Sequence, residues 1–199
     1  MTNIKVKKLR KDAIIPTKAH ASDAGFDIYA LEDTIIEPGE TALIKTGLAF
    51  ELPPGYEMQI RPRSGITLKT KLRVQLGTVD AGYRAEVGVI VDNNGRTTDG
   101  IDLREGRTCP ASCNQAITLD GDYIPTNEMY KAFPYIISKG DRIAQAVIQR
   151  LPDVDLVEVD SLEESERGEG GFGSSGVSSD EKTWKEAFDV IVERAKRGD

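Results

Sequence analysis

Short runs in which apolar and polar residues alternate dominate the first three quarters of the chain. In one of them Tyr56, Met58 and Ile60 occupy every second position, so they would share one face of a β-strand. Most runs are rich in Val, Ile, Thr or Tyr, and Gly, Pro and Asn separate them. The pattern predicts an all-β barrel or sandwich and disfavours an α/β fold. The predicted strands are residues 4–9, 26–31, 41–52, 56–61, 86–92, 142–151 and 154–159.

Two segments interrupt this rhythm. Residues 95–130 are polar and rich in turn-forming residues, which is long for a connection inside a compact β domain. We therefore expect an inserted subdomain or a functional loop there. Residues 153–169 are strongly acidic, and they change from alternation with Val and Leu to Ser and Gly. This change indicates a last strand that continues into a solvated linker.

The pattern becomes helical after Gly176. Ser178 and Glu181 have the spacing of a capping box, and apolar residues then recur at intervals of three and four. These apolar residues are Trp184, Phe188, Ile191 and Ala195. The sequence thus predicts a β domain at 1–160, a linker and glycine-rich flap at 161–176, and an amphipathic helix at 177–199.

Composition narrows the class of protein. The chain is 39% hydrophobic and 30% charged, which is typical of a soluble globular protein. It contains neither the ~20 apolar residues of a membrane helix nor the apolar core of a signal peptide, so we expect a cytoplasmic protein. The net charge of −7 argues against general binding to nucleic acid or anionic membranes. Any anionic ligand must therefore be bound by a local group of cations.

The two cysteines, Cys109 and Cys113, lie in one short segment. A zinc site needs about four ligands, and His20 is the only histidine in the chain. Two reduced thiols in a surface loop are the better interpretation.

The string RGEGGFGSSG at residues 167–176 is the most unusual in the chain. It contains G-x-G-x-x-G, but too few residues follow for a dinucleotide-binding βαβ unit. A Walker A motif is excluded because Ser174 stands where its lysine belongs. A flexible linker is the structural alternative, although Arg167 and Phe172 have no purpose in a linker. Amides, hydroxyls, a guanidinium and a ring together favour a mobile flap that closes over a nucleotide.

Three other segments carry weaker signals, each with a structural alternative. PRSG at residues 62–65 places a guanidinium and a hydroxyl at a strand end, where a plain turn is the simpler interpretation. Asp80 lies in a tight turn, as turn-forming aspartates usually do. Arg142 and Gln145 open a strand and could simply form an exposed face.

Taken in order, five segments resemble the five motifs of the homotrimeric dUTPases: residues 24–27, 62–65, 77–86, 140–145 and 167–176. Family members usually carry a second Asp and a Gly in the third motif, where this chain has Gly82 and Ala85. Asp80, which matches the catalytic base, is kept. The insert at 95–130 is similar to that of the phage-encoded staphylococcal enzymes.

The resemblance implies a trimer of β-barrel, jelly-roll subunits that hydrolyses dUTP to dUMP and pyrophosphate with Mg²⁺. This activity limits uracil in DNA and supplies dUMP for dTMP synthesis. Asp80 would be the catalytic base, and Asp27 would reach a Mg²⁺ through water while the substrate phosphates hold most of the metal's coordination. The positions matched to substrate binding are Arg63, Ser64, Gly65, Gly77, Tyr83, Gln145, Arg167, Phe172, Gly173, Ser174 and Ser175.

Recognition of the nucleoside follows from the same resemblance. Backbone groups of residues 77–83 would read the uracil edge, and cytosine would leave them unpaired. Tyr83 would pack under the deoxyribose and exclude a 2′-hydroxyl, and Phe172 would stack on the base. The rival functions are a dCTP deaminase, which shares the β fold, and a nucleotide-binding protein without catalysis. The resemblance also implies a repressor protein as a partner of the insert.

Overall fold

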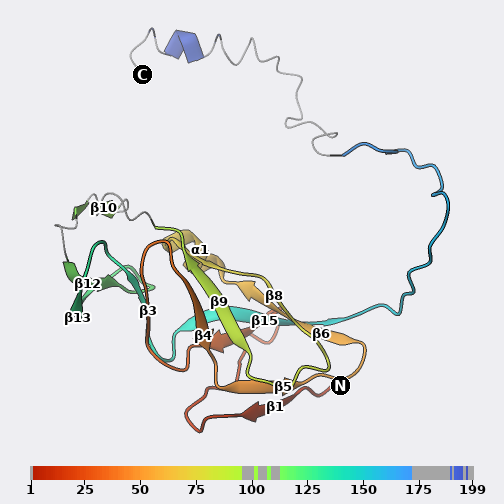
Figure 1. The fold of residues 1–199 in the computed structure, drawn as a ribbon, viewed down its shortest axis with the longest axis horizontal. Helices are drawn as coiled ribbons and strands as arrows, with labels where there is room; N and C mark the ends of the chain where they lie inside the picture. Colours follow the sequence, from red (N-terminus) through yellow and green to blue (C-terminus); the bar gives the residue numbers. More distant parts are fainter. Residues whose placement is uncertain are drawn as a thin grey trace. The chain divides into compact units, whose positions relative to one another are not determined.

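The structure is a computed structural model that describes residues 2–95, 101–102, 107–108, 113–171, 189, 191–194 and 196. The chain divides into two units, Met1–Val154 and Asp155–Asp199. The first unit carries the β-sheets (Figure 1). No helix in the described ranges is long and apolar enough to cross a membrane.

The sheet that positions most of the site has the strand order β2-β15-β6-β8. Its strands are β2 (Phe26–Tyr29), β15 (Arg142–Arg150), β6 (Tyr56–Pro62) and β8 (Gly77–Val79). All neighbouring strands are antiparallel. The alternation predicted for β6 is confirmed, because Met58 and Ile60 are buried between less buried neighbours.

A second sheet has the order β4-β9-β7, formed by β4 (Thr41–Lys45), β9 (Gly88–Asn93) and β7 (Leu72–Val74). One of its faces contributes Ile44 and Val89 to the core. Its other face is also partly apolar, since Leu43 and Ile90, which pair directly, are exposed.

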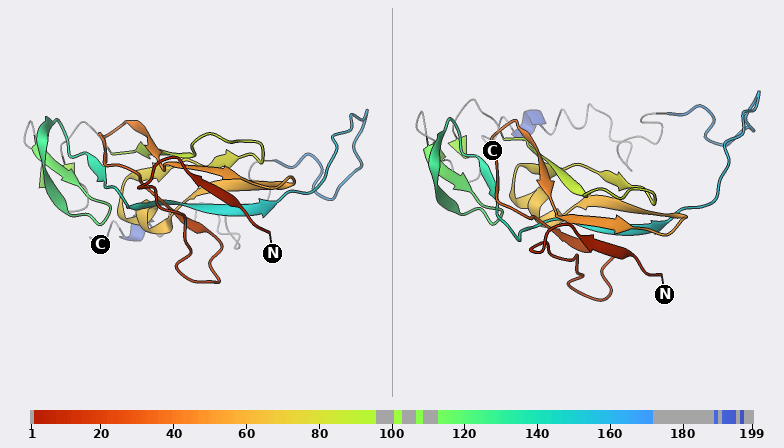
Figure 2. Two further views of the ribbon diagram at one scale, coloured as in Figure 1. Left: turned by 90° about the horizontal axis from the view of Figure 1, so that it is seen from below. Right: turned by 60° about the horizontal axis from the view of Figure 1, so that its bottom comes forward.

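The insert is built into a third sheet. Its order is β13-β12-β14-β3, with β3 (Thr34–Ile36), β14 (Tyr135–Ile137), β12 (Cys113–Ile117) and β13 (Tyr123–Tyr130). We call residues 113–130, which form β12, a tight turn and β13, the insert hairpin. Figure 2 shows the insert hairpin in green at one end of the first unit, away from β1.

The remaining elements are short. β1 (Lys5–Lys8) pairs with β5 (Leu48–Glu51), and β10 (Ile101–Asp102) pairs with β11 (Arg107–Thr108). Directly after β6 the chain forms the helix α1 (Ser64–Lys69).

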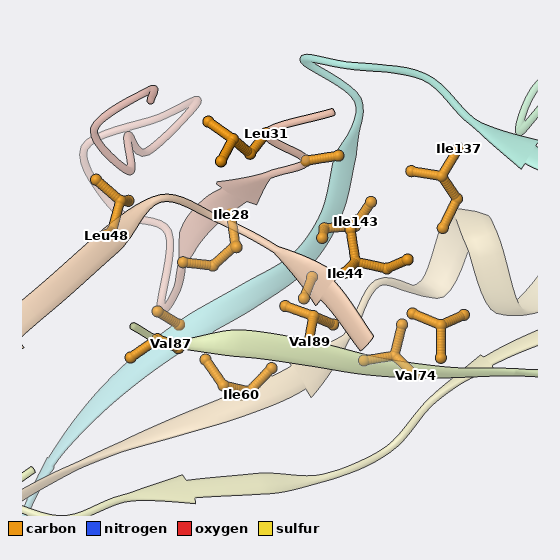
Figure 3. Close-up of a cluster of buried hydrophobic side chains, with 14 of the residues drawn as sticks. Ile28, Leu31, Ile44, Leu48, Ile60, Val74, Val87, Val89, Ile137 and Ile143 are labelled. Atoms are coloured by element: carbon orange, nitrogen blue, oxygen red, sulfur yellow. The ribbon is translucent and has the colours of Figure 1, made fainter. Parts of the chain in front are cut away.

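One apolar core joins the sheets. Figure 3 shows side chains from β2, β4, β6, β9, β14 and β15 converging on it. Ile28, Ile44, Val89, Ile137 and Ile143 are buried there with essentially no exposed surface. This arrangement confirms the predicted all-β class.

Some local expectations are corrected. Residues 41–52 form two strands, because the chain turns at Gly47, where φ is +68° and an added Cβ would lie 3.0 Å from Ala13 and Leu31 side chains. Residues 154–159 form no strand, since nothing in the described chain pairs with them. Cys113 is a free thiol but is buried on β12 instead of lying in a surface loop, and Cys109 lies outside the described residues.

At the C-terminal end, the described residues 189, 191–194 and 196 are helical and lie within the predicted helix, whereas Ser178 and Glu181 of the predicted capping box lie outside the described residues. Ile191 is exposed on this helix. Trp184, Phe188 and Ala195 of the predicted apolar stripe lie outside the described residues.

Candidate active site

A pocket of about 530 Å³ opens where β6 passes into α1 and where β15 begins. Three cationic side chains line it, together with polar groups and the turn of the insert hairpin. The lining residues are Arg63, Ser64, Gly65, Ile66, Lys69, Leu119, Asp120, Gly140, Asp141, Arg142 and Gln145. The structure thus brings the predicted residues Arg63, Ser64, Gly65 and Gln145 together.

Asp27 lies beneath this pocket as a buried carboxylate, only 5% exposed. Its Oδ1 is 3.2 Å from Nε of Arg63, and its Oδ2 is 3.6 Å from Nη1 of Arg142. Arg63 Nη1 also donates to the backbone carbonyl of Arg142 at 2.9 Å. Within the described residues Asp27 Oδ1 has no hydrogen-bond partner. The carboxylate therefore holds two guanidiniums in place through charge.

The strand register explains why these residues meet. Gln145 on β15 is paired with Asp27 on β2 on one side and with Arg61 on β6 on the other. Arg63 follows β6 by one residue, so it reaches the same end of the sheet. An anion held here would meet side chains of β15 and of the segment that follows β6.

Helix α1 presents Ser64 and Gly65 at the pocket. Arg63 is its N-cap residue, and the helix is anchored by the buried side chain of Ile66. A Cβ added at Gly65 would meet nothing within 4 Å, so the backbone is open toward the pocket side. Backbone N–H groups and a hydroxyl are thus accessible to a ligand.

Asp80 and Tyr83 lie in the turn that follows β8, and both are exposed. The Tyr83 backbone N–H donates to the Asp80 carbonyl at 3.0 Å, and its hydroxyl donates to the Glu86 carbonyl at 3.0 Å. The ring is thereby fixed at the surface of the turn.

This turn is not part of the pocket within one chain. Val79 pairs with Met58, and Gly77 pairs with Ile60, so Asp80 follows the end of β8 that lies near the start of β6. Arg63 lies five residues beyond Met58, a span of about 17 Å at strand spacing. The predicted catalytic base and the predicted phosphate ligands therefore occupy opposite ends of β6.

The glycine-rich segment belongs to the second unit. Arg167 is exposed, and its Nε donates to the Gly170 carbonyl at 2.8 Å. Gly168 adopts a positive φ of +50° and donates its N–H to Ser165. Phe172, Gly173, Ser174 and Ser175 lie outside the described residues.

Four charged residues that line the pocket are not among the predicted site residues: Lys69, Asp120, Asp141 and Arg142. Arg142 was recognisable as a cation at a strand start, but its contact with Asp27 depends on the pairing of β15 with β2. Asp120 belongs to the insert, whose proximity to the pocket has no signal in the local sequence.

Metal ligands are sparse around these residues. The described part of the chain holds no group of three or more His, Cys, Asp or Glu side chains placed to bind a metal ion. Burial raises the pKa of Asp141, whose Oδ2 accepts a hydrogen bond from the Ser138 N–H at 2.8 Å. This carboxylate is thus engaged in the turn before β15.

The fold and the pocket define an all-β protein whose cationic cavity, rich in arginine, serine and glutamine, suits a polyphosphate anion. The model of the dUTPase family matches residues 11–107 and 126–176, and the chain belongs to this family. The unmatched stretch between these segments falls inside the expected insert. The resemblance found in the sequence is thereby confirmed.

Individual relatives agree with this assignment. A deoxyuridine 5′-triphosphate nucleotidohydrolase of Clostridioides difficile is 40% identical over 178 residues, which cover 88% of this chain and 99% of the relative. A single-residue mutant of the Staphylococcus bacteriophage 80alpha dUTPase, solved with dUpNHpp, is 37% identical with a TM-score of 0.78. That similarity covers 89% of this chain and 100% of the phage protein.

A second phage structure is a mutant dUTPase from phage phi11 of S. aureus. It is 29% identical with a TM-score of 0.72, covering 81% of this chain and 99% of that chain. It is described as revealing the coordination of a structural Mg(II) ion, and another phi11 structure as showing a species-specific insert. The structural relatives thus include phage enzymes, as the insert suggested.

Proposed function

We propose that this protein is a dUTP diphosphatase, which hydrolyses dUTP to dUMP and pyrophosphate and so limits uracil in DNA and supplies dUMP for dTMP synthesis. The observation that carries the proposal is the cationic pocket of about 530 Å³, in which Arg63, Ser64 and Gln145 converge above the buried Asp27. Membership of the dUTPase family supports the same conclusion. In an acidic chain, this cluster supplies the local cations that a tetraanionic substrate needs.

Asp80 is the proposed general base. Its carboxylate would take a proton from water as the water oxygen attacks the α-phosphorus, and the bond from this phosphorus to the bridging oxygen of pyrophosphate would break. Arg63, Ser64 and Gln145 would hold the phosphates in line for this displacement. Asp80 is exposed in this chain, which leaves its carboxylate free to meet substrate and water.

Recognition of the base is assigned to backbone groups of residues 77–83. They would satisfy the hydrogen-bonding edge of uracil and leave cytosine with unpaired groups. The Tyr83 ring, fixed by its hydrogen bond to Glu86, would pack under the deoxyribose and leave no room for a 2′-hydroxyl.

Mg²⁺ is the expected metal, and the donor set fits an ion held mainly by the substrate. The described chain has no carboxylate cage, and the oxygens of Asp27 already face two guanidiniums. Oδ1 of Asp27 nevertheless lacks a hydrogen-bond partner among the described residues, so it could accept one from metal-bound water. When bound, Mg²⁺ would offset phosphate charge and polarise the phosphoryl oxygens.

The separation of the two predicted site halves supports a homotrimer with shared sites. Asp80 and Arg63 lie at opposite ends of β6, so a site that uses both would combine residues of different chains. Apolar surfaces support assembly: Leu43 and Ile90 form an exposed pair on the β4-β9-β7 sheet, and Leu156 is 100% exposed after β15. Sedimentation should give a mass of three chains at micromolar concentration, and a single-chain mass would contradict the proposal.

The glycine-rich segment is assigned to closure over the bound nucleotide. Arg167 would contact the phosphates, Phe172 would stack on uracil, and the backbone and hydroxyls of Gly173, Ser174 and Ser175 would surround the phosphate chain. Arg167 is exposed and its only described side-chain bond is to the nearby Gly170 carbonyl, so it is free to change partners.

A second role is proposed for the insert, namely binding of a repressor protein in the cytoplasm of a bacterial host. One 80alpha phage structure is described in terms of control of virulence gene transfer by a G protein-like mechanism. In this chain β13 is an edge strand and carries the exposed Met129. Met129→Asp should abolish capture of the partner while dUTP hydrolysis is unchanged; capture at wild-type level would contradict this role.

One assay tests the main function against its rivals. The purified protein is mixed with dUTP, dCTP, dTTP and UTP, and pyrophosphate and ammonia are measured. Pyrophosphate from dUTP alone is the expected result. Ammonia from dCTP would indicate a deaminase, and binding of dUTP without any product would indicate a nucleotide-binding protein.

A further inference from the structure

The insert hairpin reaches the phosphate pocket. Leu119 and Asp120 from its turn line the same cavity as Arg63, Arg142 and Gln145. The Asp120 side chain is 86% exposed, and one carboxylate oxygen lies 3.9 Å from Nζ of Lys69, the last residue of α1. An acidic residue of the insert thus stands at the entrance to a pocket built for an anion.

The turn that carries Asp120 is locally well defined. The Thr118 N–H donates to the Asp122 carbonyl at 2.9 Å, and the Gly121 N–H donates to the Thr118 carbonyl at 3.0 Å. Gly121 has a φ of +97°, a conformation that side chains other than glycine rarely adopt. Asp120 is therefore presented from a closed turn and not from a loose loop.

The insert hairpin is also anchored to the core. The Ile117 N–H donates to the Pro134 carbonyl at 2.8 Å, and Ile117 pairs in parallel with Tyr135 on β14. Tyr123 packs edge-on against Phe133, with ring centroids 5.1 Å apart. These contacts hold the hairpin against β14 and the loop that precedes it.

Asp120 lies near one cation and one other carboxylate of the pocket. Among the described residues, Lys69 is the cation that it meets, while Asp141 faces the same cavity. Burial raises the pKa of Asp141, and the negative charge of Asp120 raises it further. The field of Asp120 therefore extends into the space where phosphate would bind.

We propose that Asp120 is a specificity-determining residue of the phosphate pocket, which holds Lys69 away from the bound anion and lowers the affinity of the pocket for polyphosphates. The inference rests on the proposed function, because it takes polyphosphate as the ligand of this cavity. The consequence is weaker retention of pyrophosphate, the more highly charged product, after hydrolysis.

The test is titration of inorganic pyrophosphate by calorimetry into the wild type, Asp120→Asn and Asp122→Asn. Asp122 is exposed in the same turn but does not line the pocket. Asp122→Asn changes the net charge by the same amount as Asp120→Asn, so it is the matched control. We expect Asp120→Asn to bind pyrophosphate about two- to fivefold more tightly, the range of an exposed ion pair, and Asp122→Asn to bind as the wild type does. The gain should shrink at high salt, because exposed charges are screened.

Lys69→Gln provides the second arm. It should weaken pyrophosphate binding, and adding Asp120→Asn to it should then produce a smaller gain than in the wild type, because the partner is gone. In turnover assays, Asp120→Asn should lower KM for dUTP at unchanged kcat.

The outcomes separate this inference from the function itself. Unchanged or weaker pyrophosphate binding in Asp120→Asn would overturn the inference, and so would an equal gain in Asp122→Asn. If the wild type does not hydrolyse dUTP but pyrophosphate binding responds as described, the proposed function fails while the role of Asp120 stands. Both substituted aspartates are exposed, so the variants should fold like the wild type.

Discussion

Nε of Arg63 lies 3.2 Å from Oδ1 of Asp27. This ion pair joins a guanidinium that lines the pocket to a carboxylate that is buried in the same sheet. The first residue follows β6 and the second lies on β2, and β15 runs between these two strands. Arg142 completes the group from the start of β15. One buried aspartate thus orients both guanidinium groups that line the pocket.

Asp27→Asn keeps the shape of this side chain and removes its charge. We expect KM for dUTP to rise about tenfold with a smaller change in kcat, because Arg63 loses the partner that orients it. Steady-state kinetics at saturating Mg²⁺ provide the measurement. If KM returned fully to the wild-type value at high Mg²⁺, Asp27 would act only through metal-bound water. Asp33→Asn, in an exposed residue outside the pocket, is the control.

Asp80→Asn tests the general base. Turnover should fall by roughly 10²-fold or more while nucleotide binding is largely retained, since the amide cannot take the proton from water. Single-turnover kinetics and calorimetry with a non-hydrolysable analogue would separate the two effects. A variant with nearly wild-type kcat would show that another group is the base.

Tyr83 is expected to exclude ribonucleotides. Tyr83→Ala should raise the ratio of kcat/KM for UTP to that for dUTP by about tenfold, because the space under the sugar opens. Tyr83→Phe loses the hydrogen bond to Glu86 but keeps the ring, so its ratio should stay close to that of the wild type. Equal ratios in both variants would exclude a steric role for the ring.

Truncation after Glu166 tests the flap. The first unit ends at Val154, so the truncated chain should retain its β core and thermal transition. Turnover should nevertheless collapse, because the substrate would remain in an open site accessible to water. Normal kcat and KM in the truncated protein would exclude a catalytic role for the glycine-rich segment.

Asp12 is expected to contribute to stability in a pH-dependent way. Hydrogen bonds from Lys139, at 2.5 Å, and Arg10, at 3.0 Å, hold the pKa of Asp12 well below its ordinary value. As the pH falls, the unfolded chain therefore binds this proton before the folded chain does. The stabilisation is complete above about pH 5 and is lost as the pH falls from there through the lowered pKa of the folded state. Urea unfolding of Asp12→Asn should show a smaller loss of stability than the wild type below about pH 4. Parallel curves for the two proteins would contradict it.

The class of fold and several polar residues of the pocket could be predicted from the amino-acid sequence. Alternation in residues 56–61 is a local property of strands, because every second side chain faces the core, and β6 has this arrangement. The PRSG string and the pair Arg142 and Gln145 could likewise be identified as polar groups at strand ends. These groups line one pocket because β6 and β15 are neighbours in the sheet.

Other features depend on contacts that no local pattern encodes. Residues 154–159 alternate like a strand, but a strand needs a hydrogen-bonding partner, and the described chain offers none. Cys113 was expected in a surface loop and is buried because β12 joins the sheet of β14 and β3.

Which charged side chains lie next to one another depends on how the strands pair and pack. Strand register places Asp27 next to Arg63 and Arg142, and the same register sends Asp80 to the far end of β6. The anchored insert hairpin brings Asp120 to Lys69, although about fifty positions separate them along the chain. Periodicity is set by the geometry of a single strand, whereas these distances are set by how strands pair and pack, which is why the sequence pattern alone could not give them.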